Sequence, residues 1–267
     1  MPHGPIVLFG SGETSKHGRQ VHARVFERLE VPVRVAIVET PAGFQPNVAT
    51  VTAKLRAFFC HNLSGFRPEV RIVAARRKGG VYDPDAPEIV APLEWAAYIF
   101  AGPGSPTYAA RHLAGTRTLA LMQRRAAEGA VLSFASAAAI ASGRYALPVY
   151  EIYKAGEDLH WVPGLDLFGR LGFNLTVVPH WNNAEGGRDL DTSHCFVGAE
   201  RFRYLRRLLP PETTILAIDE HTACILDPAT ERVEVLGAGQ VHVIRGPRED
   251  RFASGESFPF TLLRVPE

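Results

Sequence analysis

The chain has 267 residues, of which 46% are hydrophobic and 21% are charged, as is ordinary for a globular protein. Its formal net charge of +1 gives no electrostatic reason to expect binding to nucleic acid or to an anionic membrane. No apolar run approaches the roughly 20 residues of a membrane span, and the three cysteines form no CxxC pair. We therefore expect a cytoplasmic protein with neither nucleic acid nor a membrane as its partner.

Short apolar runs alternate along the chain with longer segments of helical periodicity. Runs that suit strands covered on both faces are Pro5–Phe9, Val33–Val38, Val70–Ala74, Tyr98–Ala101, Val131–Phe134, Leu175–Val178 and Thr214–Ile218. Apolar residues at three- and four-residue spacing predict helices over Lys16–Leu29, Asn47–Leu63, Thr116–Glu128 and Glu200–Leu208. This alternation predicts an α/β protein with a mostly parallel central sheet and helices on both faces.

The C-terminal part has a different pattern, in which short apolar or alternating segments are joined by turns. These segments are Thr222–Leu226, Arg232–Leu236, Gln240–Arg245 and Phe258–Val265. We expect them to form antiparallel strands that close one edge of the sheet. No linker-like stretch interrupts the chain, so a single domain over residues 1–267 is predicted.

The turn after the fifth predicted strand carries the candidate nucleophile, Ser136. A buried strand precedes this serine, and the small residues that follow it begin a helix. Such a turn exposes the hydroxyl above a helix N-terminus, where the amide of Ala137 can point at an oxyanion. The alternative interpretation is that Ser136 is simply the N-cap of that helix, a role that serine often fills.

A neighbouring glycine-rich turn, Gly102–Pro106, follows the fourth predicted strand. The carboxyl ends of parallel strands gather at one edge of a sheet, so this turn lies near Ser136. Because Pro103 has no N–H, the second oxyanion donor would come from Gly104 or Ser105.

A nucleophilic serine needs a base, and the base needs an acceptor that orients it. His180 ends the run that begins at Leu175, which places it at the same edge of the sheet. Glu151 is the acid that we expect to orient the imidazole, with Glu157 and Asp158 as alternatives. Taken alone, a histidine at a strand end is more typical of a structural cap.

Six motifs occur in a characteristic order along the chain: Gly10–Glu13, Gly102–Ser105, Phe134–Ala139, Glu151, Pro179–His180 and Ile218–Ala223. Over roughly residues 5–227 they resemble the cyanophycinase and peptidase E family of serine hydrolases, within the class I glutamine amidotransferase-like superfamily. The resemblance implies one such domain with a flavodoxin-like three-layer sandwich fold. It also implies hydrolysis of an amide or peptide bond by Ser136, His180 and Glu151, without a cofactor.

Two positions depart from the pattern of that family, because Phe134 and Ala138 stand where it has glycines beside the serine. A Cβ atom at either position would strain a sharp turn, which motivates a second hypothesis. In it, the protein binds a small amino-acid-like ligand without turnover, and the Ser136 hydroxyl caps its own helix. A distance near 3 Å between Ser136 Oγ and a ring nitrogen of His180 favours the enzyme instead.

Other polar residues near these turns are candidates for contact with a small-molecule or peptide substrate. They are Gly12, Glu13, Ser105, Trp181, Asn182, Asn183 and Glu185. The sequence leaves the substrate open, together with the choice between a monomer and a homodimer.

Acidic and histidine side chains also crowd the stretch from His180 to His194. Imidazole and carboxylate can bind zinc or manganese, which gives a third hypothesis, a metal-dependent hydrolase that uses both histidines. The spacing matches no ligand motif, so we favour a polar loop without a metal. For Glu220 and His221, in the late motif, we expect a supporting role outside the triad.

Overall fold

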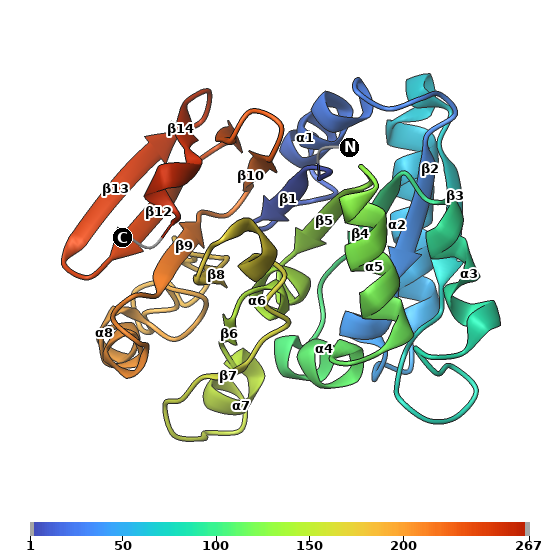
Figure 1. The fold of residues 1–267 in the computed structure, drawn as a ribbon. Coiled ribbons are helices and arrows are strands. Elements are labelled where there is room, and N and C mark those ends of the chain that lie inside the picture. The colour runs from blue at the N-terminus through green and yellow to red at the C-terminus, as the bar shows by residue number, and fades with distance from the viewer. Residues whose placement is uncertain (1–2, 265–267) are drawn as a thin grey trace.

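The structure is a computed structural model that describes residues 3–264 (Figure 1). Its main sheet has eight strands in the order β14-β11-β10-β1-β5-β4-β2-β3. Five neighbours are parallel: β1 (Ile6–Phe9), β5 (Val131–Ala135), β4 (Tyr98–Ala101), β2 (Arg34–Val38) and β3 (Glu69–Val73). Beyond β1 the sheet continues with antiparallel strands β10 (Thr222–Asp227), β11 (Arg232–Gly237) and β14 (Ser257–Pro259).

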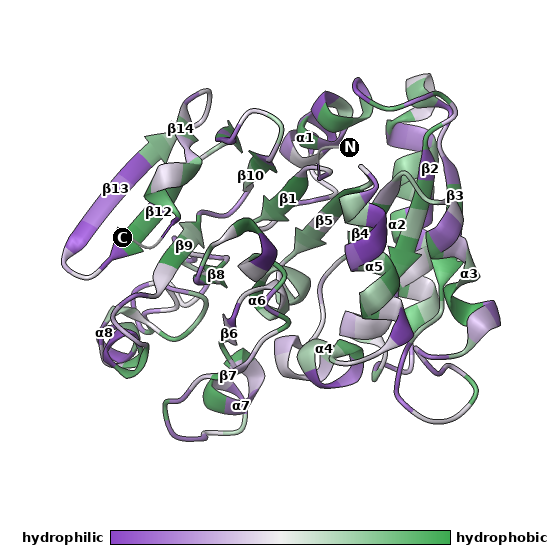
Figure 2. Cartoon of the chain, in the orientation of Figure 1, coloured by the Kyte–Doolittle hydropathy of each residue, from purple (hydrophilic) through white to green (hydrophobic). Residues whose placement is uncertain are grey.

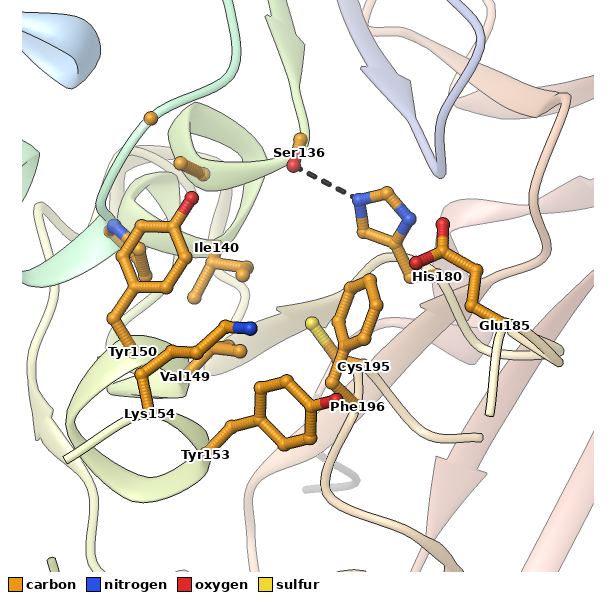
Figure 3. Close-up of a pocket in the computed structure, with 13 residues that line it drawn as sticks. Ser136, Ile140, Val149, Tyr150, Tyr153, Lys154, His180, Glu185, Cys195 and Phe196 are labelled. Carbon is orange, nitrogen blue, oxygen red and sulfur yellow. Dashed lines mark hydrogen bonds between the residues drawn. The ribbon is translucent and has the colours of Figure 1, made fainter. Parts of the chain in front are cut away.

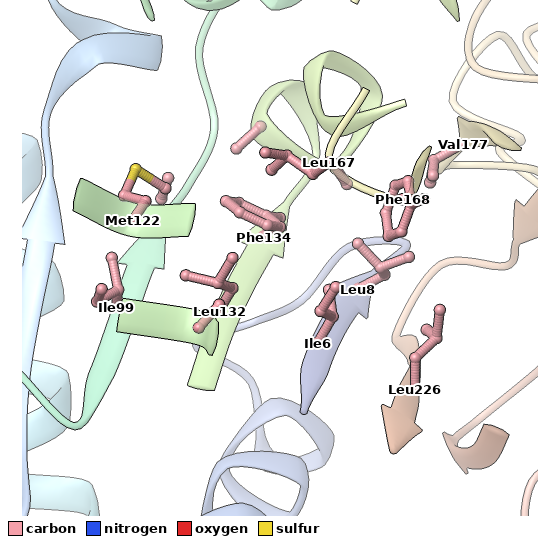
Figure 4. Close-up of a cluster of buried hydrophobic side chains, with 14 of the residues drawn as sticks. Ile6, Leu8, Ile99, Met122, Leu132, Phe134, Leu167, Phe168, Val177 and Leu226 are labelled. Carbon is pink, nitrogen blue, oxygen red and sulfur yellow. The ribbon is translucent and has the colours of Figure 1, made fainter. Parts of the chain in front are cut away.

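Helices cover both faces of the main sheet, because successive side chains of each central strand point to opposite faces. Val7 and Phe9 pack with α1 (Lys16–Phe26) and α2 (Val48–Asn62). Ile6 and Leu8 belong to the core on the other face, much of which Figure 4 shows. The helices there are α3 (Pro87–Trp95), α5 (Arg117–Ala127) and α6 (Ala137–Ser142).

A second sheet of four strands lies beside the first, in the order β13-β12-β9-β8. Its strands are β8 (Leu175–Val178), β9 (Thr214–Ile218), β12 (Gln240–Arg245) and β13 (Arg248–Ala253), of which β8 and β9 run parallel. One face packs against α8 (Ala199–Leu208), and the other face shares the core of the main sheet.

Short elements between and after these strands complete the fold. They are α4 (Pro106–Leu113), α7 (Val149–Tyr153), the two-stranded β6 (Tyr145–Ala146) and β7 (Val162–Pro163), and 3-10 turns at Thr40–Ala42, Ser64–Phe66, Gly169–Leu171 and Phe260–Leu262. Across residues 3–264 no helix has both the length and the apolar character needed to cross a membrane.

The predicted α/β class with a mostly parallel central sheet is confirmed. The predicted strands Leu175–Val178, Thr214–Ile218 and Gln240–Arg245 exist, but they form the second sheet instead of extending the first. The missed strand β13 is rich in Arg, Glu and Asp, because it lies at an exposed sheet edge (Figure 2). The single domain over residues 1–267 stays a prediction.

The predicted strand Phe258–Val265 is largely wrong. Only Ser257–Pro259 pairs with β11, and a 3-10 turn follows. Pro259 has no N–H to donate to a further ladder, so pairing ends there. Val265 lies outside the described residues.

A buried polar pair joins α1 to the main sheet beneath the first strand-end turn. Nε2–H of His22 donates to the carbonyl of Glu13 (3.1 Å), so Nδ1 of the neutral ring accepts from the Tyr98 hydroxyl (2.7 Å). Aromatic rings surround the imidazole, with Phe9 and Phe59 at centroid distances of 4.9 and 5.0 Å. Burial lowers the pKa of His22 from 6.5 to about 3.

This pair predicts a specific loss of stability in acid. Between pH 6.5 and about pH 3 the unfolded chain binds a proton at His22 that the folded protein does not bind, so the free energy of unfolding falls as the pH drops. In urea unfolding experiments, the free energy of unfolding of the wild type should be about 2 kcal/mol lower at pH 5 than at pH 7 because of His22. This contribution should be absent in His22→Gln. His61→Gln, at an exposed position of α2, is the matched control and should keep the full pH dependence. An unchanged pH dependence in His22→Gln would contradict this account.

Candidate active site

Ser136 occupies the turn between β5 and α6 in a backbone conformation that few residues with a side chain adopt. Its φ is 51° and its ψ is −114°. Its side chain makes no capping hydrogen bond to α6, and Oγ lies 2.9 Å from His180 Nε2 (Figure 3). Phe134 and Ala138 both pack into the core, so the turn forms with side chains at the two positions beside the serine. This geometry matches the enzyme hypothesis and differs from the helix cap expected of a binding protein.

His180 follows β8 and is held through its backbone, which has a φ of 53°. Its N–H donates to the carbonyl of Gly10 (3.1 Å), and its own carbonyl accepts from the N–H of Cys195 (3.1 Å). Nδ1 lies 2.9 Å from Oε1 of Glu220. An ionised carboxylate only accepts hydrogen bonds, so Nδ1 carries the proton and Nε2 is free to accept from the Ser136 hydroxyl.

Glu220 follows β9, the parallel neighbour of β8, so its side chain emerges beside His180. Its Oε1 also accepts from Nδ2 of Asn183 (2.9 Å), and its backbone N–H donates to Oδ1 of Asn182 (2.7 Å). The hydrogen bond from His180, assisted by that from Asn183, lowers the pKa of Glu220 against the opposing effect of burial. The carboxylate is therefore ionised at neutral pH and can orient the imidazole.

The acid beside His180 is thus a different residue from the one expected, Glu151. Glu151 lies on α7, and its buried Oε2 has no hydrogen-bond partner within residues 3–264. The alternatives Glu157 and Asp158 are exposed beyond α7. The chain between β5 and β8 forms α7 and a following loop, and within residues 3–264 none of these three carboxylates makes a hydrogen bond or ion pair with His180.

Two backbone amides lie next to Ser136. Ala137 is the first residue of α6, so its N–H has no acceptor within the helix. Within the described part of the chain, neither this N–H nor that of Gly104 has a hydrogen-bond acceptor. Gly104 lies against the 3-10 turn Thr40–Ala42, and a Cβ atom there would come within 1.9 Å of the Pro41 carbonyl oxygen. Only glycine fits that position, which fixes the path of the loop beside Ser136.

Ser136, His180, Ala137 and Gly104 border a cavity of about 340 Å³ (Figure 3). Its remaining wall is aromatic and aliphatic, and comes from α4, α6, α7 and the loop before α8: Pro106, Ile140, Val149, Tyr150, Tyr153, Cys195 and Phe196. Lys154 and Glu185 add one charge of each sign, and both side chains point into the cavity. Neither has an ion-pair partner within 4.0 Å among residues 3–264. The wall residues lie in short segments without clear periodicity, so sequence reasoning missed them.

Of the residues expected to touch a substrate, Glu185 lines this cavity and the others do not. Asn182 and Asn183 hold Glu220, as described above. The ring of Trp181 packs against that of His194, 4.0 Å away between centroids. Ser105 is buried and caps α4 by accepting from the N–H of Tyr108.

Gly12 and Glu13 lie in the turn after β1. A Cβ atom at Gly12, which has a φ of 68°, would come within 2.4 Å of Nδ1 of His221. Burial raises the pKa of Glu13, and the positive charge that His180 can carry opposes this rise. Neither residue lines the cavity.

The metal hypothesis required a set of ligands around His180 and His194. Both ring nitrogens of His180 are occupied by Ser136 and Glu220. Nδ1 of His194 lies 2.6 Å from the hydroxyl of Ser193. Within residues 3–264 no group of three or more His, Cys, Asp or Glu side chains is arranged to hold a metal ion.

Comparison with solved structures places this geometry in a known fold. A peptidase from an acI-B1 Actinobacterium superposes with a TM-score of 0.76 over 97% of this chain and 98% of that chain, at 21% sequence identity. A putative peptidase E protein from Listeria monocytogenes EGD-e superposes with a TM-score of 0.54 over 94% and 98%, at 17% identity. No protein-family model and no curated protein sequence matches the chain. The similarity establishes a shared, flavodoxin-like α/β fold.

The two acids can be separated by the reactivity of the serine. We expect Glu220→Gln to slow labelling of the protein by a fluorophosphonate roughly 100-fold or more, because the amide no longer holds His180 in its reactive tautomer. Glu151→Gln makes the same chemical change on α7 and should stay within about twofold of the wild type. Labelling rates measured for both variants test this, and a larger loss in Glu151→Gln would reverse the assignment.

Proposed function

We propose that this protein is a serine hydrolase that cleaves an amide or peptide bond, with Ser136 as nucleophile, His180 as general base and Glu220 as the orienting acid. The observation that carries the proposal is the continuous pair of 2.9 Å hydrogen bonds from Ser136 Oγ through the imidazole to the carboxylate. The motif order along the chain supports placement with the cyanophycinase and peptidase E type of hydrolase, in the class I glutamine amidotransferase-like superfamily. The proposed triad keeps the Ser-His-Glu chemistry and replaces Glu151 by Glu220.

The first half of the reaction follows from the protonation states that the contacts require. Ser136 Oγ attacks the carbonyl carbon while its proton passes to Nε2 of His180. The resulting imidazolium is stabilised by Glu220, whose lowered pKa keeps it ionised. His180 then gives the proton to the departing amine, and the C–N bond breaks to leave an acyl group on Ser136.

Water completes the cycle: His180 removes a proton as water attacks the acyl carbon, the ester bond to Ser136 Oγ breaks, and His180 returns the proton to Oγ as the carboxylic acid product leaves. In both halves a negative charge develops on the former carbonyl oxygen. The free N–H groups of Ala137 and Gly104 are the donors we assign to that oxygen, since both border the cavity beside Ser136.

An amide or peptide bond is the target that the fold supports best. Two solved structures that share it are a peptidase and a putative peptidase E protein. The cavity of about 340 Å³ is at the small end of ligand pockets, which favours a small molecule or the end of a peptide. Its unpaired Lys154 and Glu185 offer one partner each for a carboxylate and an amine.

Substitution of the nucleophile gives the direct test. Ser136→Ala should abolish fluorophosphonate labelling and lower turnover of any amino-acid p-nitroanilide that the wild type cleaves by about 10⁴-fold or more. Ser142→Ala, on the same helix, is the matched control, because its hydroxyl donates to a backbone carbonyl within α6. Labelling or turnover that survives in Ser136→Ala would refute the proposal.

The oxyanion assignment has its own test at Gly104. An added Cβ atom must displace the loop from Pro41, so Gly104→Ala should move the amide donor and slow acylation by roughly 10²- to 10³-fold. Gly65→Ala is the matched control, since a Cβ atom there meets no atom within 4 Å. Labelling rates measured below the unfolding temperature of each variant give the comparison. An acylation rate unaffected by Gly104→Ala would remove this residue from the mechanism.

A further inference from the structure

A second concave surface lies on the opposite face of α4 from the cavity. It has a volume of about 500 Å³ and is lined by cations and aromatic rings: Gly43, Phe44, Arg77, Tyr108, Arg111 and His112. We call this surface the basic cleft. Pro106 of α4 faces the cavity, whereas Tyr108, Arg111 and His112 lie on the opposite side of the helix, as a spacing of 100° per residue requires.

Positive charge in the basic cleft is not neutralised by the protein itself. Arg77, Arg111 and the adjacent Lys78 are exposed, and none lies within 4.0 Å of a carboxylate among residues 3–264. Burial lowers the pKa of His112, and the positive charges of these three residues lower it further. The acid nearest in sequence, Asp83, accepts hydrogen bonds from the backbone of its own loop.

Aromatic rings form the other part of the basic cleft. The side chain of Phe44 is exposed (47%), and its ring lies 5.2 Å from that of Tyr108 between centroids. Tyr108 in turn lies 4.2 Å from His112, with the Arg111 guanidinium 5.6 Å from its ring. Guanidinium groups bind carboxylates through paired hydrogen bonds, and the rings offer contact area to the apolar part of the same ligand.

The basic cleft and the cavity are connected by a short, well-fixed segment. Ser105, next to Gly104, donates its N–H to the carbonyl of Pro41 (2.9 Å), and Phe44 follows that turn. Both hollows include residues of α4, which lies near the ends of β2, β4 and β5 (Figure 1). Pro41 touches Gly104, which lines the cavity, and the same turn leads directly into Gly43 and Phe44, which line the basic cleft.

We propose that the basic cleft binds an acidic segment of a peptide substrate whose scissile bond lies in the cavity. This inference rests on the proposed peptidase function for the identity of the ligand. The cations of the basic cleft would pair with glutamate or aspartate side chains of the peptide that lie outside the cavity. The aromatic rings of the cleft would contact the apolar groups of the peptide between those side chains.

Binding of a dye-labelled hexaglutamate peptide, measured by fluorescence anisotropy, tests the inference without requiring catalysis. Ser136→Ala is the background protein, so that the peptide stays intact. Adding Arg77→Ala and Arg111→Ala together should weaken binding by about tenfold, because two exposed ion pairs are lost. Adding Arg203→Ala and Arg207→Ala removes the same charge from exposed positions on α8, and should change binding by less than about twofold.

The comparison peptide is hexaglutamine, which should bind at least about tenfold more weakly than hexaglutamate. Three outcomes would overturn the inference: no binding of hexaglutamate, equal binding of the two peptides, or equal losses in the two double substitutions. Tighter binding of a thymidine hexanucleotide would also overturn it, in favour of a nucleic acid ligand. If a fluorophosphonate fails to label Ser136 in the wild type, the proposed function is contradicted. The peptide-binding measurement does not depend on that labelling, so its result can be judged independently.

Discussion

Gly10 is the residue on which the relative placement of the two sheets depends. Its carbonyl accepts from the N–H of His180, and its N–H donates to the carbonyl of Thr222 (2.8 Å). A Cβ atom at Gly10 would come within 2.0 Å of the carbonyl oxygen of Asp219, the residue before Glu220. The parallel register of β1 and β5 also pairs Phe9 with Ala135, which places Ser136 beside Gly10. One glycine without a side chain thus lets Ser136, His180 and Glu220, which follow three different strands, meet at one point.

Positive φ recurs where the strands of the site end. Ser136, His180 and His221 have φ values of 51°, 53° and 55°, and each such residue costs of order 1–3 kcal/mol unless its surroundings fix it. The surroundings do so here. His180 is bonded through both backbone groups, and the N–H of His221 donates to the hydroxyl of Ser11 (3.0 Å). The core around Phe134 and Ala138 fixes Ser136. The arrangement of Ser136, His180 and Glu220 is therefore built into the fold and needs no ligand to form.

Sequence reasoning placed Ser136 and His180 at the correct edge because each ends a short, fully buried apolar strand, a feature that a sequence displays directly. It missed Glu220 because the relevant fact is the pairing of β8 with β9, and pairing between strands distant in sequence has no local signature. An acid between the serine and the histidine in chain order was expected, which favoured Glu151. The division into two sheets was missed for the same reason, since strands of either sheet carry the same apolar pattern.

The overall charge balance of the sequence also does not reveal where charges of one sign gather in the structure. The chain has 29 Lys and Arg residues against 28 Asp and Glu residues, and this balance argues against a general attraction to polyanions. That argument concerns the field of the whole molecule at a distance, which salt screens within about 10 Å. At contact range the local arrangement decides, and the turn of α4 brings Arg111 and His112 against the segment that carries Arg77. Meanwhile Lys154 and Glu185 leave the cavity itself balanced. The two hollows therefore carry different fields, one mixed in the cavity and one positive beyond α4.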